Sequence, residues 1–214
     1  MLDKFRDTFD EYLEKIYKKE QNSGINILSD VKNFAKYDTW EEYWDNEKSK
    51  SELIKVMYEC STKYLNIIFY LSKSTGPVLI YSNYLLMEGL DLLKVYLKYF
   101  GYDSFKNPNS KDYFRYGEFH GSVSREVRKE TIKMETDKDN AYGKLIKIVM
   151  FSPAGAEGIS LESIRQVHLM EPYWHEVRMI QMIGRAIRQC SHKYLPIKER
   201  HVDIYRYRSV KHNV

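Results

Sequence analysis

Hydrophobic positions in the first third of the chain recur at helical spacing. Over residues 2–20, apolar side chains return every three or four positions, and charged residues fill the other side. Residues 51–73 repeat this pattern, which predicts a second long helix. The stretch 25–50 has weaker periodicity and predicts short helices and loops. The N-terminal part is therefore expected to be helical.

The pattern changes after the breaker Gly76-Pro77. Short apolar runs of the buried-strand type then alternate with amphipathic segments. The predicted strands are 78–82, 114–120, 146–152, 167–170 and 202–207. The predicted helices are 84–100, a segment from Ser122 or Ser124 to about Met134, and 177–188. This alternation predicts an α/β fold with a parallel sheet flanked by helices. We expect residues 1–50 to form a helical appendage and residues 51–214 to form the main domain.

Composition supports a folded domain and excludes several classes of protein. Hydrophobic residues make up 43% of the chain and aromatic residues 14%, which suffices for a core. No apolar run approaches the roughly 20 residues of a membrane span, so no membrane partner is expected. Cys60 and Cys190 form neither a disulfide framework nor a zinc pattern. We therefore expect an intracellular, reducing setting. We expect no metal site.

Charge is distributed unevenly along the chain. Residues 1–50 carry 9 Lys and Arg against 12 Asp and Glu, whereas residues 175–214 carry 9 against 3. A basic C-terminal region suits contacts with phosphate groups of nucleotide or nucleic acid. A solvated basic face is an equally good interpretation of charge alone.

The most specific motif is the string Q-x-x-G-R-x-x-R, which spans residues 181–188. On a helix that continues to Arg188, Gln181, Arg185 and Arg188 share one face. Guanidinium groups stay protonated and bind phosphate oxygens in pairs, so two of them form a fork for an anion. Gly184 lets another backbone approach. The alternative is a surface helix with ordinary arginines.

This string resembles motif VI of the superfamily 2 helicases and translocases. The resemblance implies a C-terminal RecA-like domain whose Arg185 and Arg188 reach the γ-phosphate of ATP, with Gln181 near the phosphate or the attacking water. It places Gly184 on the nucleotide side. Arginine fingers of this kind contribute roughly 10³–10⁵ in rate to phosphoryl transfer.

Residues 152–161 carry small side chains and two glycines directly after a predicted strand. Backbone N–H groups in such a loop can approach an anion closely. The loop resembles motif V, which implies nucleotide contacts for Glu157 and Gly158. It also implies contacts with the nucleic-acid backbone for Ser152, Ala154 and Gly155. Ser160 stands where many relatives carry Asp or Asn. A tight strand-to-helix connection without ligand is the alternative.

Further elements resemble the nucleic-acid track of the same family. Ser82 and Asn83 end the strand that resembles motif IV, and ligands gather outside such strand ends. His120, Gly121 and Ser122, followed by Arg128, resemble the H-G-x…R element. For His120, a core or capping role is the stronger alternative, and Arg128 also suits a solvated helix face. Trp174 is expected to pack rather than to stack on a base.

The chain lacks the sequence motifs that a domain needs to bind ATP by itself. Its only Gly-Lys pair, Gly143-Lys144, is followed by Leu145 rather than Ser or Thr. The carboxylates Glu41-Glu42 follow no apolar strand and are expected at the surface. ATP with Mg²⁺ is therefore expected on an N-terminal RecA domain outside this chain, and this fragment alone is expected to be inactive.

The combination of motifs looks closest to a viral branch, the nucleoside triphosphatase I and early transcription factor family of large DNA viruses. That resemblance implies an ATP-dependent helicase or nucleoside triphosphatase in viral transcription. Its implied partners are the DNA or RNA backbone, the N-terminal RecA domain and transcription machinery, and its implied location is the virion and host cytoplasm. The alternative is a helicase-like scaffold without catalysis that binds nucleic acid or a transcription partner.

Overall fold

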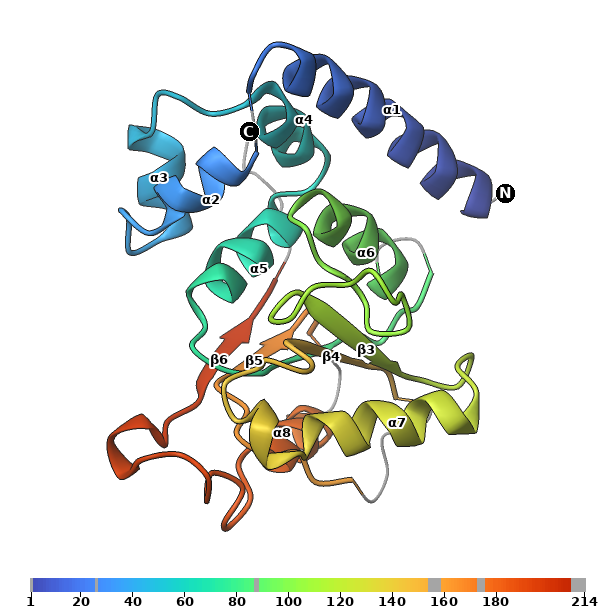
Figure 1. Cartoon of the computed structure of the whole chain (residues 1–214), viewed down its shortest axis with the longest axis vertical. Helices are drawn as coiled ribbons and strands as arrows, with labels where there is room; N and C mark the ends of the chain where they lie inside the picture. The colour runs from blue at the N-terminus through green and yellow to red at the C-terminus, as the bar shows by residue number, and fades with distance from the viewer. Residues whose placement is uncertain (1, 26, 87–88, 154–158, 173–175, 209–214) are drawn as a thin grey trace. The chain divides into compact units, whose positions relative to one another are not determined.

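The computed structural model describes residues 2–25, 27–86, 89–153, 159–172 and 176–208. The chain divides into two compact units, one helical and one built on a sheet (Figure 1). Met1–Lys73 with Leu86–Tyr102 form the helical unit, and Ser74–Leu85 with Asp103–Val214 form the sheet unit. None of the described helices combines the length and the apolar character that crossing a bilayer requires.

The helical unit contains the helices α1 (Leu2–Asn22), α2 (Leu28–Phe34), α3 (Trp40–Asn46), α4 (Glu52–Cys60), α5 (Thr62–Lys73) and α6 (Leu90–Tyr99). Thr39 and Glu42 form a capping box at the start of α3. The core is aromatic: the rings of Phe34 and Tyr43 meet edge to face with their centroids 4.8 Å apart. This confirms the short helices predicted over residues 25–50.

Two predicted helices have different limits in the structure. The helix predicted over 51–73 is two helices, because Ser61 adopts an extended conformation between α4 and α5. The helix predicted from residue 84 begins only at Leu90, after Gly89. The amide of Tyr84 donates to the Ser82 hydroxyl, so the chain turns there instead of starting a helix.

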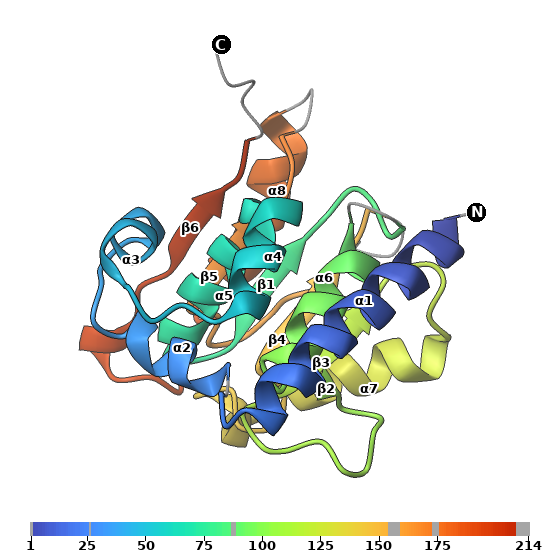
Figure 2. The same cartoon turned by 90° about the horizontal axis from the view of Figure 1, so that it is seen from above.

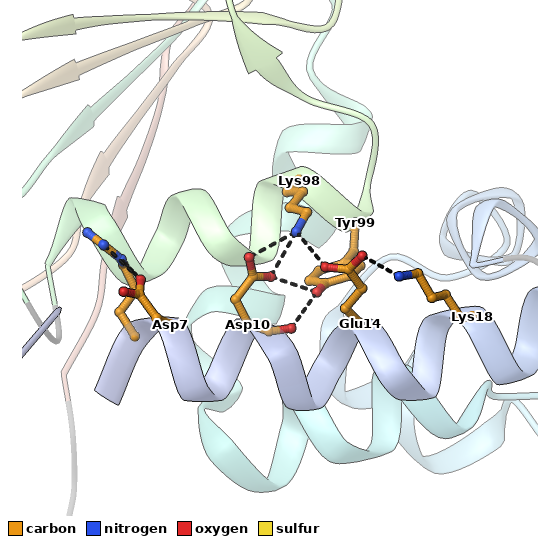
Figure 3. Close-up of polar contacts among 7 residues, drawn as sticks. Asp7, Asp10, Glu14, Lys18, Lys98 and Tyr99 are labelled. Atoms are coloured by element: carbon orange, nitrogen blue, oxygen red, sulfur yellow. Dashed lines mark hydrogen bonds and ion pairs between the residues drawn. The ribbon is translucent and has the colours of Figure 1, made fainter. Parts of the chain in front are cut away.

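Helix α1 is fastened to α6 by a polar cluster (Figure 3). Lys98 Nζ lies 2.9 Å from an oxygen of Asp10 and 3.5 Å from an oxygen of Glu14. The hydroxyl of Tyr99 donates to the same Asp10 carboxylate at 2.6 Å. Lys18 pairs with Glu14 one turn further along α1, at 2.9 Å. The N-terminal helix is therefore part of the helical unit and not a free extension.

The sheet unit has one sheet whose strands all run parallel, in the order β2-β3-β4-β1-β5-β6. Its strands are β1 (Val78–Tyr81), β2 (Asp103–Ser104), β3 (Arg115–Phe119), β4 (Ile148–Phe151), β5 (Gln166–Leu169) and β6 (Asp203–Arg206). The predicted parallel sheet is confirmed. The short β2 is not among the predicted strands, because its two polar residues carry no apolar signal.

Helices α7 (Arg125–Glu135) and α8 (Glu176–Ala186) contribute to one hydrophobic core with the sheet. Alternate strand residues such as Leu79, Val149 and Val167 meet Met179 and Met182 of α8 in this core. Figure 2 shows α7 on the β3 side of the sheet and α8 toward β5 and β6. Short 3-10 turns occupy Lys138–Asn140 and Ile197–Glu199.

Gly117 shows why a small residue is needed between β3 and α7. A Cβ atom added there would lie 2.6 Å from Cγ2 of Thr131, closer than any ordinary contact. Ser124 caps α7 through the amide of Val127, which confirms it as the cap. Together these contacts fix the turn that carries residues 120–124.

Candidate functional site

The carboxyl ends of the central strands bring two predicted residues to one edge of the sheet. Tyr81 is in register with Phe151 of β4 and Leu169 of β5, so the residues that follow these strands emerge together. Ser82 and Ser152 are both buried there. The amide of Ser82 donates to the carbonyl of Phe151 at 3.1 Å. The backbone thus holds the ends of the predicted motif IV and motif V strands side by side.

Glu171, which the sequence reasoning missed, completes this edge. Its carboxylate accepts from the Ser82 hydroxyl, 3.0 Å from each oxygen, and from the Asn83 amide at 3.0 Å. Ser82 and Asn83, both predicted to contact nucleic acid, therefore donate hydrogen bonds to a carboxylate within the same unit. The only signal in the sequence is an acid two residues past a buried strand, which many surface loops share.

The arginine motif differs from its predicted geometry in one respect. Helix α8 ends at Ala186, so Arg188 lies beyond the helix and does not share a helical face with Gln181 and Arg185. The helix ends there because the Arg185 carbonyl accepts from the amide of Leu161, at 3.2 Å. The expectation of one helical face for all three residues was wrong.

Both arginines nevertheless meet at the same loop. Nη1 of Arg185 donates to the carbonyl of Ile159 at 3.2 Å. Nη1 of Arg188 donates to the hydroxyl of Ser160. Arg185 is half-buried, whereas Arg188 is exposed. The end of the small-residue loop and the arginine motif therefore form one contiguous site, although 26 and 28 residues separate the partners.

Gln181 and Gly184 lie on the open side of α8. Gln181 is exposed, and an added Cβ at Gly184 would meet no heavy atom within 4 Å. Within the described part of the chain nothing fills the space beside this glycine. That leaves room for an approaching ligand or backbone, as the motif predicted.

The buried Glu135 carboxylate holds the end of the loop at residues 159–162. Glu135 of α7 accepts from the amide of Glu162 at 3.1 Å, just after the loop, and burial raises the pKa of the Glu135 carboxyl well above its usual value. The side chain of Glu162 pairs with Lys193 at 2.8 Å. Residues 159–162 are thus anchored from both α7 and the segment after α8.

The element at the end of β3 shows both buried and exposed polar groups. His120 is buried, and its Nε2 lies 3.1 Å from a carboxylate oxygen of Glu118. Gly121 and Ser122 are exposed at the turn before α7. The guanidinium carbon of Arg128 lies 5.8 Å from the centre of the Phe119 ring. These positions suit both a nucleic-acid contact and local packing.

Several predicted residues lie outside the described residues, namely Ala154, Gly155, Glu157, Gly158 and Trp174. Among the residues that the structure describes, no group of three or more His, Cys, Asp or Glu side chains is placed to hold a metal ion. The cationic and amide groups of Arg185, Arg188 and Gln181 fit phosphate oxygens rather than a cation.

Two curated proteins to which this chain is similar are viral. The protein named "Putative ATP-dependent RNA helicase R350" of Acanthamoeba polyphaga mimivirus is 41% identical over 215 residues, covering 98% of this chain and 26% of that protein. Nucleoside triphosphatase I of Melanoplus sanguinipes entomopoxvirus is 33% identical over 159 residues, covering 74% of this chain and 23% of that protein. The chain thus spans about a quarter of the length of these relatives.

Two solved structures to which this chain is similar are an ATPase domain and a helicase domain. The C-terminal part of the Fun30 ATPase domain is 21% identical with a TM-score of 0.42, covering 89% of this chain and 52% of that chain. Domain 2 of the DEAD-box helicase Mss116p, bound to an RNA duplex, is 13% identical with a TM-score of 0.39, covering 69% of this chain and 48% of that chain.

A family model places the chain directly. The model described as the helicase conserved C-terminal domain matches residues 58–190, which include both motifs and all strands but β6. The match covers more than half of the chain and confirms the resemblance drawn from residues 152–161 and 181–188. The fold is RecA-like α/β, and the chain belongs to the helicase conserved C-terminal domain family.

Proposed function

We propose that this chain is the second RecA-like domain of an ATP-dependent nucleic-acid helicase or translocase. In this proposal, a first RecA-like domain binds ATP and Mg²⁺, and Arg185 and Arg188 stabilise the charge that develops on the γ-phosphate. The observation that carries the proposal is the convergence of both guanidinium groups on residues 159–161. It joins the predicted fingers to the loop that the resemblance assigns to nucleotide and nucleic acid.

The environment of Arg188 suits a residue that changes partners. Its guanidinium is exposed, and its hydrogen bond goes to the neutral hydroxyl of Ser160. A hydrogen bond with one charged group contributes about 1.5–3 kcal/mol. A phosphate oxygen adds the attraction between opposite charges to that bond. Exchange of Ser160 for a phosphate oxygen is therefore favourable when ATP is presented.

Arg185 suits a more static role. Its Nη1 is bound to the Ile159 carbonyl and its own carbonyl is bound to Leu161, so the residue is tied to the loop twice. A shift of the loop on nucleic-acid binding would then move Arg185 with it. This linkage supports coupling between the nucleic-acid track and the catalytic arginines.

The nucleic-acid part of the proposal uses the exposed turn at Gly121 and Ser122 together with Ser152, Arg128 and the loop that follows β4. Contacts to the backbone give binding without sequence preference. The setting we propose is viral transcription, which rests on the family resemblance alone.

The test uses the full-length protein with Arg188→Ala. We expect the turnover number for nucleic-acid-stimulated ATP hydrolysis to fall by roughly 10³-fold or more. The affinity for ATP should change much less, because the first domain holds most of the nucleotide. Arg178→Ala, an exposed arginine on the same helix but outside the motif, is the matched control and should leave turnover intact.

Each outcome has a defined meaning. Unchanged turnover in Arg188→Ala contradicts the finger assignment. Absence of any ATP hydrolysis in the unaltered full-length protein, together with retained nucleic-acid binding, favours a non-catalytic scaffold. The isolated chain should hydrolyse no ATP, since it supplies only half of the site.

A further inference from the structure

Helix α7 carries a row of three exposed cations. Arg125, Lys129 and Lys133 follow one another at intervals of four residues, and all three are exposed. Within the described part of the chain, none of them forms an ion pair or a side-chain hydrogen bond. By contrast, Lys98 and Lys193 pair with carboxylates. We call Arg125, Lys129 and Lys133 the α7 cation row.

The geometry of the helix makes this row straight and continuous. Residues four apart lie on one side of a helix and are separated by about 6 Å along the axis, so the row is about 12 Å long. Thr131 and Glu135 are buried on the other side of α7, so the row points away from the core. Helix α7 is the yellow helix in Figure 1.

Two neighbouring acids, Glu126 and Glu130, offset the three cations of the row only in part. Glu126 lies in the first turn of α7, and hydrogen bonds from its own backbone amide and from Ser124, together with the charges of Lys129 and Arg125, lower the pKa of its carboxyl. It therefore serves the helix N-terminus, which favours negative charge. Glu130 lies on the adjoining side of the helix and forms no ion pair among the described residues.

The row disfavours the isolated helix. Like charges four residues apart destabilise a helix by about 0.2–0.5 kcal/mol per pair. Arg125 also lies in the first turn, where the helix dipole disfavours a positive charge. The three cations outnumber Glu126 and Glu130, so a net positive charge remains on the exposed side of α7 and favours an anionic partner.

The location of the row connects it to the proposed nucleic-acid track. It starts one residue after the Ser124 cap and three residues after Ser122. Nearby, Nδ1 of His120 and Nε of Arg128 are buried without hydrogen-bond partners in the described structure. The Nε–H group of Arg128 is therefore an unused donor at the end of β3, where the row begins, whereas Nδ1 of a neutral His120 is an acceptor when Nε2 donates to Glu118.

We propose that the α7 cation row binds the sugar-phosphate backbone of a nucleic-acid duplex, next to the strand on which the motor moves. Over 12 Å, one strand of a duplex presents roughly three to four phosphates, which matches three cations. A rigid, straight row favours a rigid duplex over a flexible single strand. The inference rests on the proposed function, because it takes nucleic acid as the substrate.

The test compares the full-length protein with a triple variant, Arg125→Gln, Lys129→Gln and Lys133→Gln. Gln has a helix propensity close to that of Arg and Lys, so the fold should be retained. Affinity is measured from 50 to 200 mM salt for duplex DNA, duplex RNA and single strands. The salt slope is the fall in the logarithm of affinity per unit rise in the logarithm of salt concentration. Loss of three phosphate contacts should reduce this slope for a duplex by about 2.7. Over this fourfold range, the unaltered protein should then lose about 40-fold more affinity than the variant.

The control variant makes the same change in net charge elsewhere. Lys4, Lys15 and Lys55 are exposed in the helical unit, and their replacement by Gln should leave the duplex slope unchanged. A row variant whose duplex slope equals that of the unaltered protein overturns the inference, and an equal fall for single strands overturns the duplex assignment. Unaltered protein that binds no nucleic acid contradicts the proposed function as well. Failure of the inference alone appears as an unchanged duplex slope in a protein that binds nucleic acid and loses turnover in Arg188→Ala, so the two failures are distinguishable.

Discussion

Removal of the Glu171 carboxylate tests how the sheet edge is held together. In Glu171→Ala, the amide of Asn83 loses its acceptor at 3.0 Å. The Ser82 hydroxyl loses the same carboxylate but has a second acceptor, the Tyr84 carbonyl at 2.8 Å. Of these two donors, in the described part of the chain, the Asn83 amide is thus the one that loses its acceptor.

The magnitude follows from this count. A hydrogen bond to a charged group contributes about 1.5–3 kcal/mol, and a neutral replacement for the Ser82 hydroxyl recovers about 1 kcal/mol. Asn83 is half-buried, so hydrogen bonding to water replaces part of the bond that its amide loses. We expect Glu171→Ala to lower the free energy of unfolding of the sheet unit by about 2–3 kcal/mol. Glu171→Gln retains one acceptor oxygen and should cost about half as much.

Urea unfolding and hydrogen exchange measure the two consequences separately. With a slope of about 1–3 kcal/mol per molar urea, the Ala variant should shift the midpoint by about 1 M. The amide of Asn83 should lose protection in Glu171→Ala and keep most of it in Glu171→Gln. An unchanged midpoint with a protected Asn83 amide in the Ala variant would refute the role of Glu171.

Two buried ionisable groups predict opposite dependences of stability on pH. Burial raises the pKa of Glu135, so the folded state binds more protons than the unfolded state, and stability falls as pH rises from about 4.5 through the raised value. Glu135→Gln should remove that fall in a pH series of melting temperatures while still accepting from the Glu162 amide; an unchanged slope would contradict this. Burial lowers the pKa of Lys147 from 10.5 to about 8, so the unfolded state binds more protons and stability rises between about pH 8 and 10.5. The rise should amount to about 3 kcal/mol and vanish in Lys147→Met, and its persistence there would assign it to other groups.

The sequence alone predicted the elements whose signal is local. Strands β1 and β4 are buried throughout and consist of apolar residues, so each can be recognised without its partner, whereas β5 adds the buried polar residues Gln166 and His168 to Val167 and Leu169. Their alternation with amphipathic helices predicted the parallel sheet, because parallel strands need long crossovers. The strings at 152–161 and 181–188 predicted the family, since their residue types and order are specific.

Tertiary structure decided where those elements end and which polar groups meet. Helix α8 stops at Ala186 because Leu161 takes up the Arg185 carbonyl, and Arg188 is placed by Ser160, 28 residues away. The carboxylate of Glu171 meets Ser82 across 89 residues of sequence. A helix limit or a polar pair depends on partners that only folding brings close, and local periodicity carries no record of them. The residue types of the candidate site follow from the sequence. Their contacts depend on the sheet, because the sheet brings distant strand ends to one edge.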